Sequence, residues 1–184
     1  CRRRKIYMII DEAYYEFYGL SAKKFLSTYK NLFIIRTLSK YFGFSGLRLG
    51  YILGHESFLT QLRKMQAPWS INAFSSFAAV EALKHTKEFE QIKRTLDNAK
   101  DDLYSFFVQH NIEVWPTKTN FLVIKSKNYQ RIKNELRKRN ILVGDLSHQP
   151  FAKHYLRDAL RISIPVGKDL SRLQKAFTEA IKPL

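Results

Sequence analysis

Two short apolar runs restrict the folds open to this chain of 184 residues. Residues 6–10 form a continuous apolar run that ends at Asp11, and residues 32–35 form a second one. Such runs indicate strands buried on both faces, as in a parallel sheet covered by helices. A short helical stretch is predicted over 21–29 and a third strand over 51–53. We therefore expect a strand–helix–strand arrangement in this part of the chain.

A long periodic segment predicts one extended helix. Its apolar side chains are Phe89, Ile92, Leu96, Ala99, Leu103 and Phe106. Steps of three and four residues place them on one helical face, which is typical of a helix packed on a core. Two further helices are predicted before it, over 56–65 and from about 73 to 83, on either side of Pro68.

The pattern changes after Asn111, where short strands alternate with helices. The predicted strands are 113–115, 120–124, 141–143 and 160–164, and the predicted helices are 128–139 and 168–181. Strands and helices mixed around a small sheet indicate an α+β domain. We place the domain boundary inside the long helix, so that 1–85 belong to a first domain, 86–112 to an interdomain helix and 113–184 to a small C-terminal domain.

Composition excludes several classes of protein. Hydrophobic residues make up 45% and aromatic residues 14%, which suffices for a packed core. No apolar run reaches the roughly 18 residues of a membrane span. One cysteine cannot form an intramolecular disulfide and favours a reducing compartment, so we expect a cytoplasmic protein. The five histidines are scattered, and no spacing fits a metal site.

The net charge of +16 leaves two interpretations open. It can mark an anionic partner such as nucleic acid, or it can reflect solvated helix faces rich in lysine. The basic residues are dispersed along the chain, and no nucleic-acid-binding motif is present among them. We therefore keep a basic nucleic-acid-binding module only as a remote alternative and expect no nucleic-acid partner.

Lys40 stands in a sequence context that sets it apart from the other lysines. It ends the segment Thr37-Leu38-Ser39-Lys40, which follows the second apolar run, and a glycine-containing loop leads from it to Arg48. Taken singly, each residue could be a surface charge or a polar loop residue. The ordered set of an acidic strand end, hydroxyls, a lysine and an arginine is more specific.

These segments resemble the class I/II aminotransferases, which use pyridoxal 5'-phosphate. The resemblance is carried by Asp11-Glu12-Ala13-Tyr14, by residues 36–40 and by Gly46-Leu47-Arg48-Leu49-Gly50, and histidinol-phosphate aminotransferases are the most similar branch. It implies an α/β fold of fold type I. The chain would supply the second half of a large domain with a parallel or mixed sheet, followed by a small α+β domain.

The resemblance also implies roles for the residues that match the family motifs. Asp11 would bind the ring nitrogen of the cofactor, and Tyr14 its phenolic oxygen. Lys40 would be the catalytic Schiff-base lysine. Ser39 and Arg48, with Thr37 as a weaker candidate, would bind the cofactor's phosphate.

Two more residues are implied as substrate ligands. Arg161, in a predicted strand, matches the arginine that binds the substrate's α-carboxylate. Asn120 matches a motif residue near the site, although buried asparagines at strand starts are often structural. No metal is expected. The resemblance implies that an amino group passes between an amino acid, or an amine like histidinol phosphate, and a 2-oxo acid.

The chain departs from the family pattern at two points. It lacks the first half of the large domain, so we expect it to be part of a longer homodimeric protein of amino-acid biosynthesis, or else an inactive fragment. Gly144 stands where histidinol-phosphate aminotransferases carry a phosphate-binding arginine, and Asp145 beside it would repel phosphate. Residues 67–72 look more like those of threonine-phosphate decarboxylases, which remain an alternative.

Overall fold

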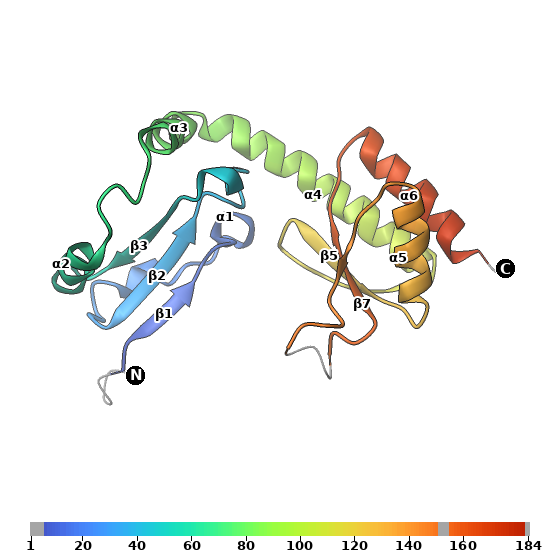
Figure 1. Ribbon diagram of the computed structural model, residues 1–184, viewed down its shortest axis with the longest axis horizontal. Coiled ribbons are helices and arrows are strands. Elements are labelled where there is room, and N and C mark those ends of the chain that lie inside the picture. The colour runs from blue at the N-terminus through green and yellow to red at the C-terminus, as the bar shows by residue number, and fades with distance from the viewer. Residues whose placement is uncertain (1–5, 151–154, 183–184) are drawn as a thin grey trace. The chain divides into compact units, whose positions relative to one another are not determined.

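The computed structural model describes residues 6–150 and 155–182, and Cys1 lies outside them. The chain divides into two compact units, Cys1–Glu90 and Gln91–Leu184. The division falls within α4, Thr86–Gln109, the long green helix of Figure 1. The apolar stripe read from the sequence lies in this helix.

The first unit is built on a sheet of three strands in the order β1–β2–β3. The strands are Met8–Asp11, Leu32–Thr37 and Gly50–Gly54. β1 and β2 run parallel, with Met8 opposite Leu32, whereas β3 is antiparallel to β2. The sheet is therefore mixed, and the strand pairs place the ends of β1 and β2 at the same edge.

Short helices and two longer ones complete the first unit. They are α1 (Tyr15–Tyr18), the 3-10 helices η2 (Ala22–Phe25) and η3 (Ser45–Leu47), α2 (Glu56–Met65) and α3 (Ala73–Lys84). The helix predicted over 21–29 is thus a single 3-10 turn, begun by Ser21, whose hydroxyl accepts from the Lys23 N–H. The second half of the stretch contains Ser27 and Thr28, whose low intrinsic helix propensity does not favour a longer helix.

Burial within the first sheet is uneven. On β2, Phe33 is 1% exposed and Ile34 is fully buried, whereas Ile9 on β1 is 61% exposed. The sequence expectation that the 6–10 run is buried on both faces is therefore wrong for this chain. An uninterrupted apolar run predicts a covered strand, but the described residues leave Met8 and Ile9 of β1 exposed.

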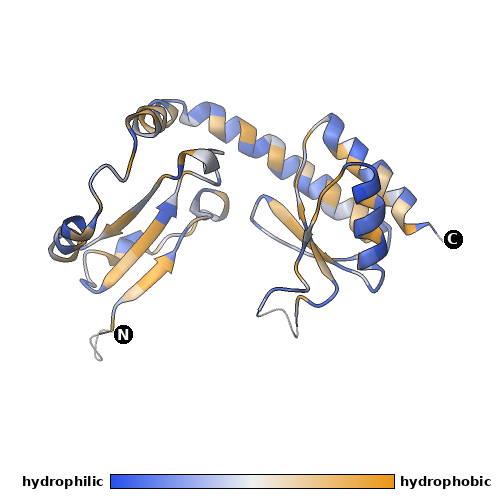
Figure 2. Cartoon of the chain, in the orientation of Figure 1, coloured by the Kyte–Doolittle hydropathy of each residue, from blue (hydrophilic) through white to orange (hydrophobic). Residues whose placement is uncertain are grey.

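The second unit holds an antiparallel sheet in the order β4–β5–β7–β6. Its elements are β4 (Glu113–Trp115), β5 (Phe121–Lys125), α5 (Tyr129–Lys138), β6 (Gly144–Asp145), β7 (Ala159–Ser163) and α6 (Lys168–Ile181). Leu103 and Phe107 of α4, Leu136 of α5 and Phe177 of α6 are fully buried in one core. In Figure 2 the face of α5 toward the viewer is hydrophilic, as expected for a helix that covers a core with its other face.

One predicted strand of the second unit is absent. Residues 141–143 form no strand, and the pairing with β7 begins only at Gly144 and Asp145. Leu142 is 83% exposed, so this apolar run does not enter the sheet. Across the described residues, no helix combines the length and apolar character needed to cross a membrane.

Candidate functional site

The parallel ends of β1 and β2 place the first candidate residues. Asp11 is the last residue of β1 and lies opposite Ile35, and the Glu12 N–H donates to the Ile35 carbonyl at 2.8 Å. Thr37, two residues further along β2, ends that strand. Strand ends that share one sheet edge are a common location for ligand-binding groups. The Asp11 carboxylate is exposed and accepts from the Ala13 N–H at 2.9 Å, which fixes the turn after β1.

Tyr14 and Lys40 approach each other from the two strand ends. The Lys40 Nζ lies 5.6 Å from the centroid of the Tyr14 ring, within the range of a cation–π contact. Both residues are partly buried. The structure thus brings together two predicted site residues that are 26 positions apart in the sequence.

Hydrogen bonds close the loop 38–49 at its base. The Leu38 N–H and the Thr37 hydroxyl both donate to the Leu49 carbonyl, each at 3.1 Å. The Gly43 N–H donates to the Lys40 carbonyl, and Gly43 has a positive φ of 71° that favours glycine. Leu38 and Leu49 are buried together with Phe42 and Ala82. The backbone around Lys40 is therefore held by both packing and hydrogen bonds.

The glycine after the loop is required by close packing. A side chain at Gly50 would place its Cβ 2.9 Å from the Arg36 carbonyl oxygen, so no larger residue fits without movement of the backbone. Gly46, by contrast, faces open space, and its role in the loop is not set by crowding.

Arg48 and Ser39 flank the same loop base. Arg48 adopts a left-handed conformation with φ of 53°, its side chain is exposed, and its Nη1 donates to the Ser45 carbonyl. The Ser39 N–H donates to the Thr37 oxygen at 3.1 Å. The Thr37 hydroxyl has a single proton and donates it to the Leu49 carbonyl, so this side chain holds the base of the loop closed. The Ser39 hydroxyl and the Arg48 guanidinium could still donate hydrogen bonds to an anion.

The remaining two candidates lie in the second unit. Arg161 of β7 stands opposite Val123 and Gly144, and its guanidinium carbon lies 4.2 Å above the Phe121 ring. Within the described residues, the buried Arg161 Nε and the buried Asn120 Oδ1 have no hydrogen-bond partner. Buried polar atoms without partners are costly, and a bound polar group could accept from Arg161 Nε or donate to Asn120 Oδ1.

Asp145 is less isolated than the sequence suggested. It is paired with Lys133 at 2.7 Å, and its side chain is 10% exposed. Burial opposes ionisation, but hydrogen bonds from Lys133 and the Ser147 N–H outweigh it and lower the pKa of Asp145. Much of the charge that was expected to repel phosphate is therefore compensated within the chain.

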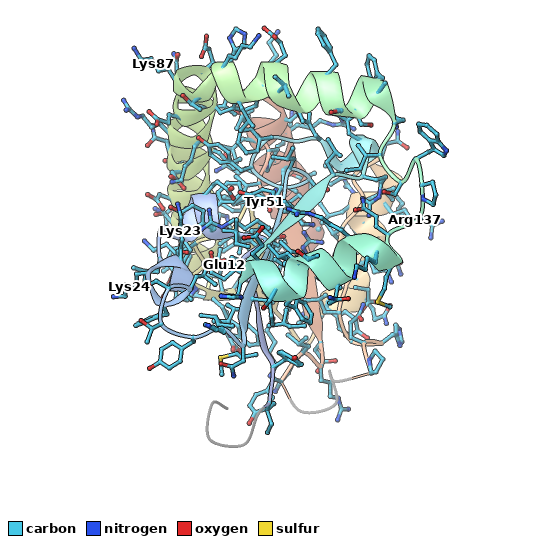
Figure 3. The ribbon with its side chains drawn as sticks, turned by 90° about the vertical axis from the view of Figure 1, so that its left-hand side faces the viewer. Glu12, Lys23, Lys24, Tyr51, Lys87 and Arg137 are labelled. Atoms are coloured by element: carbon cyan, nitrogen blue, oxygen red, sulfur yellow. The ribbon has the colours of Figure 1, made fainter. Side chains whose placement is uncertain are left out.

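A buried ion pair was missed by sequence reasoning. Arg36 Nη2 lies 2.9 Å from Glu12 Oε2, with side-chain exposures of 9% and 7%. The sequence did contain a sign of this pair, because a charged residue such as Arg36 inside an apolar strand requires a partner of opposite charge. In Figure 3, Glu12 lies in the interior of the first unit, whereas Lys23 and Lys24 lie at its rim.

A pocket of about 660 Å³ opens beside the end of β1. Asp11 and Tyr14 contribute to its wall, but none of Thr37, Ser39, Lys40 and Arg48 does. The pocket therefore does not unite the candidate residues of the two strand ends.

Comparison with known proteins identifies the family. The family described as "Aminotransferase class I and II" matches residues 1–178. The chain belongs to this family.

Its relatives include histidinol-phosphate aminotransferases. The one from Thermoanaerobacter sp. (strain X514) is 35% identical over 157 residues, which are 85% of this chain and 44% of the relative. The crystal structure of the Clostridium acetobutylicum enzyme matches with a TM-score of 0.82 and 27% identity, over 96% of this chain and 55% of that chain. A Sinorhizobium meliloti histidinol-phosphate aminotransferase in complex with pyridoxal-5'-phosphate matches with a TM-score of 0.83 and 22% identity, over 95% and 48%.

These matches confirm the sequence prediction of family and of the mixed α/β fold of these transferases. The chain spans about half the length of the relatives it matches.

Proposed function

We propose that this chain supplies the lysine-bearing part of a pyridoxal-phosphate-dependent aminotransferase. The observation that carries the proposal is the approach of Lys40 and Tyr14 at the edge where β1 ends in Asp11 and β2 ends in Thr37. Residues 1–85 form part of its large domain, 86–112 its interdomain helix, and 113–184 its small domain.

The donor set fits the cofactor. The carboxylate matches a ring nitrogen, the phenol a phenolic oxygen and the amine an aldehyde, while the hydroxyl and the exposed guanidinium both match a phosphate. The buried, unpartnered Nε of Arg161 supplies a further donor suited to a carboxylate. When bound, pyridoxal phosphate draws electrons from the α-carbon of an amino acid.

Each residue has a distinct task in this proposal. Asp11 holds a proton on the ring nitrogen, because a carboxylate favours the protonated form of a neighbouring base. Tyr14 donates to the phenolic oxygen. Lys40 would hold the cofactor through its ε-amino group at the aldehyde carbon, with loss of water, and as a free amine it would move a proton at the substrate's α-carbon.

The remaining residues bind and orient. Ser39 and Arg48 hold the phosphate at the base of the 38–49 loop, and Thr37 keeps that loop closed through Leu49. Arg161 and, more weakly, Asn120 orient the substrate. A carboxylate held by a planar guanidinium can fix the direction of the α-C–H bond toward a base.

The substrates are an amino acid and a 2-oxo acid. Gly144 lies opposite Arg161 in the sheet and has no side chain that could bind a second anionic group. A donor without phosphate is therefore favoured over histidinol phosphate. Comparing amine donors with and without a phosphate group tests this choice, and a strict requirement for phosphate would contradict it. We further propose that the protein is a cytoplasmic homodimer in amino-acid biosynthesis.

Reduction with borohydride tests the proposal directly. The full-length gene product should take up pyridoxal phosphate with visible absorbance, and reduction should mark the peptide that contains Lys40. Lys40→Ala should abolish both signals, while Lys64→Ala, a change of an exposed lysine on α2, should preserve them. A mark on another lysine would refute the assignment.

The same purified protein can be used to distinguish an aminotransferase from a decarboxylase. The resemblance of residues 67–72 to threonine-phosphate decarboxylases favours loss of carbon dioxide from a phosphorylated amino acid. Release of carbon dioxide without formation of a 2-oxo acid would support the decarboxylase. An inactive fragment would give neither product.

A further inference from the structure

A compact hydrogen-bond network surrounds the buried pair of Glu12 and Arg36. Glu12 Oε2 accepts from Arg36 Nε at 3.1 Å and from Nη2 at 2.9 Å. The Ala22 N–H donates to Glu12 Oε1 at 2.7 Å. The Ser21 hydroxyl lies within 3.1 Å of both Glu12 oxygens and 2.9 Å from Arg36 Nη2. This network joins the ends of β1 and β2 to η2.

Charge and aromatic packing complete the network. Burial alone would raise the pKa of Glu12, but hydrogen bonds from Ala22, Ser21 and Arg36 lower it below its usual range. The Arg36 guanidinium carbon lies 3.6 Å above the Tyr15 ring, and Tyr51 lies opposite Arg36 on β3.

Members of the network alternate with the proposed cofactor ligands along the chain. Glu12 follows Asp11, Tyr15 follows Tyr14, and Arg36 precedes Thr37. Neighbouring side chains of a strand point to opposite faces of its sheet, so Arg36 and Thr37 face apart. A contact that fixes Arg36 therefore also fixes the backbone from which the loop to Lys40 begins.

We propose that Glu12 and Arg36 are positioning residues, whose buried ion pair sets the spacing of Asp11, Tyr14 and the 38–49 loop for cofactor binding. The inference rests on the proposed function. Replacing a buried pair by apolar residues often costs no stability, so stability alone gives little reason to keep it. Directional bonds between two strand ends, by contrast, limit relative movement, and small misplacements weaken a binding site strongly.

The test separates positioning from simple stabilisation. In the full-length gene product, Glu12→Gln keeps the size of the side chain but removes the charge that faces Arg36. We expect the dissociation constant for pyridoxal phosphate, measured on folded protein, to rise about tenfold, with a shifted absorbance band. Thermal melts of the cofactor-free proteins record stability separately. Glu135→Gln removes a Glu–Arg pair from the second unit and should leave the dissociation constant unchanged.

A milder variant covers the case in which Glu12→Gln does not fold. Ser21→Ala removes the hydroxyl that bridges both partners but leaves the ion pair, and should raise the dissociation constant about fivefold. If the folded variants bind the cofactor as tightly as the parent and with the same band, the pair is only structural and the inference fails. A parent protein that binds no cofactor would instead overturn the proposed function, and the inference with it.

Discussion

The two units of the chain bury their apolar residues to different degrees. The second unit encloses a core from α4, the β5–β7 pair, α5 and α6, in which Leu103, Phe107 and Phe177 are fully buried. The first unit buries most of β2 and the Leu38, Phe42 and Leu49 side chains of the loop that follows it. It leaves Ile9 of β1 61% exposed and Phe74 of α3 72% exposed. Only the second unit is closed around its own sheet.

This difference bears on where each unit obtains its stability. A strand or helix that exposes large apolar side chains gains little from the hydrophobic effect until another surface covers it. All of the proposed cofactor ligands lie in the less covered unit, and the two proposed substrate ligands lie in the other. The Glu12–Arg36 network and the packed loop 38–49 hold their local geometry where the surrounding sheet is open.

The largest expected effect is a difference between the two units expressed separately. Residues 86–184 should fold on their own, with a cooperative thermal transition and dispersed amide resonances, because their core is closed. Residues 1–90 should show neither, because much of their apolar surface is uncovered. Circular dichroism and NMR measure both properties. A cooperative thermal transition of monomeric residues 1–90 would show that both units fold independently, and would contradict this prediction.

A smaller effect is expected from one core substitution in the second unit. Phe107→Ala should lower the free energy of unfolding of residues 86–184 by about 3–5 kcal/mol, because it removes a fully buried ring. Val108→Ala provides the matched control on the same helix, since Val108 is 51% exposed. Urea denaturation compares the two. Equal losses of unfolding free energy would mean that the helix face bearing Phe107 does not anchor α4 to the core.

The same contrast explains what the sequence could predict. Periodicity located α4 and gave α6 and β4 with their bounds, because α6, β4 and the C-terminal part of α4 pack on the core of the second unit. Periodicity misjudged the burial of β1. An apolar run indicates that a strand favours burial, but it does not show whether packing partners are present. Periodicity also made a strand of 141–143, where Leu142 is exposed instead.

The candidate site divides in a similar way. The motif residues were found because their spacing matches a family, and the approach of Lys40 to Tyr14 follows from the parallel pairing of β1 and β2. The Glu12–Arg36 pair depends on which side chains face each other across two strands, which one sequence does not specify. The commitment of the Thr37 hydroxyl to Leu49 likewise depends on the fold of the loop.

The smallest expected effect concerns a carboxylate in each unit. Burial raises the pKa of Glu16 in α1, partly offset by Arg36, and its buried Oε2 has no partner in the described residues. In the second unit, hydrogen bonds from Lys138 and Arg139 lower the pKa of Glu135 to about 2. The folded state therefore disfavours the charge on Glu16 and favours the charge on Glu135.

The two substitutions should consequently act in opposite directions at pH 7. In the full-length gene product, Glu16→Gln should raise the melting temperature slightly, because a destabilising charge is removed. Its advantage should vanish as the pH falls below the ordinary value of 4.5, where the parent residue is protonated in both states. Glu135→Gln should lower the melting temperature slightly at pH 7, and this loss should shrink as the pH falls from 4.5 toward about 2. Melting curves across this range measure both trends, and a Glu16→Gln protein that is less stable than the parent at pH 7 would show that Glu16 has a stabilising partner in the folded protein.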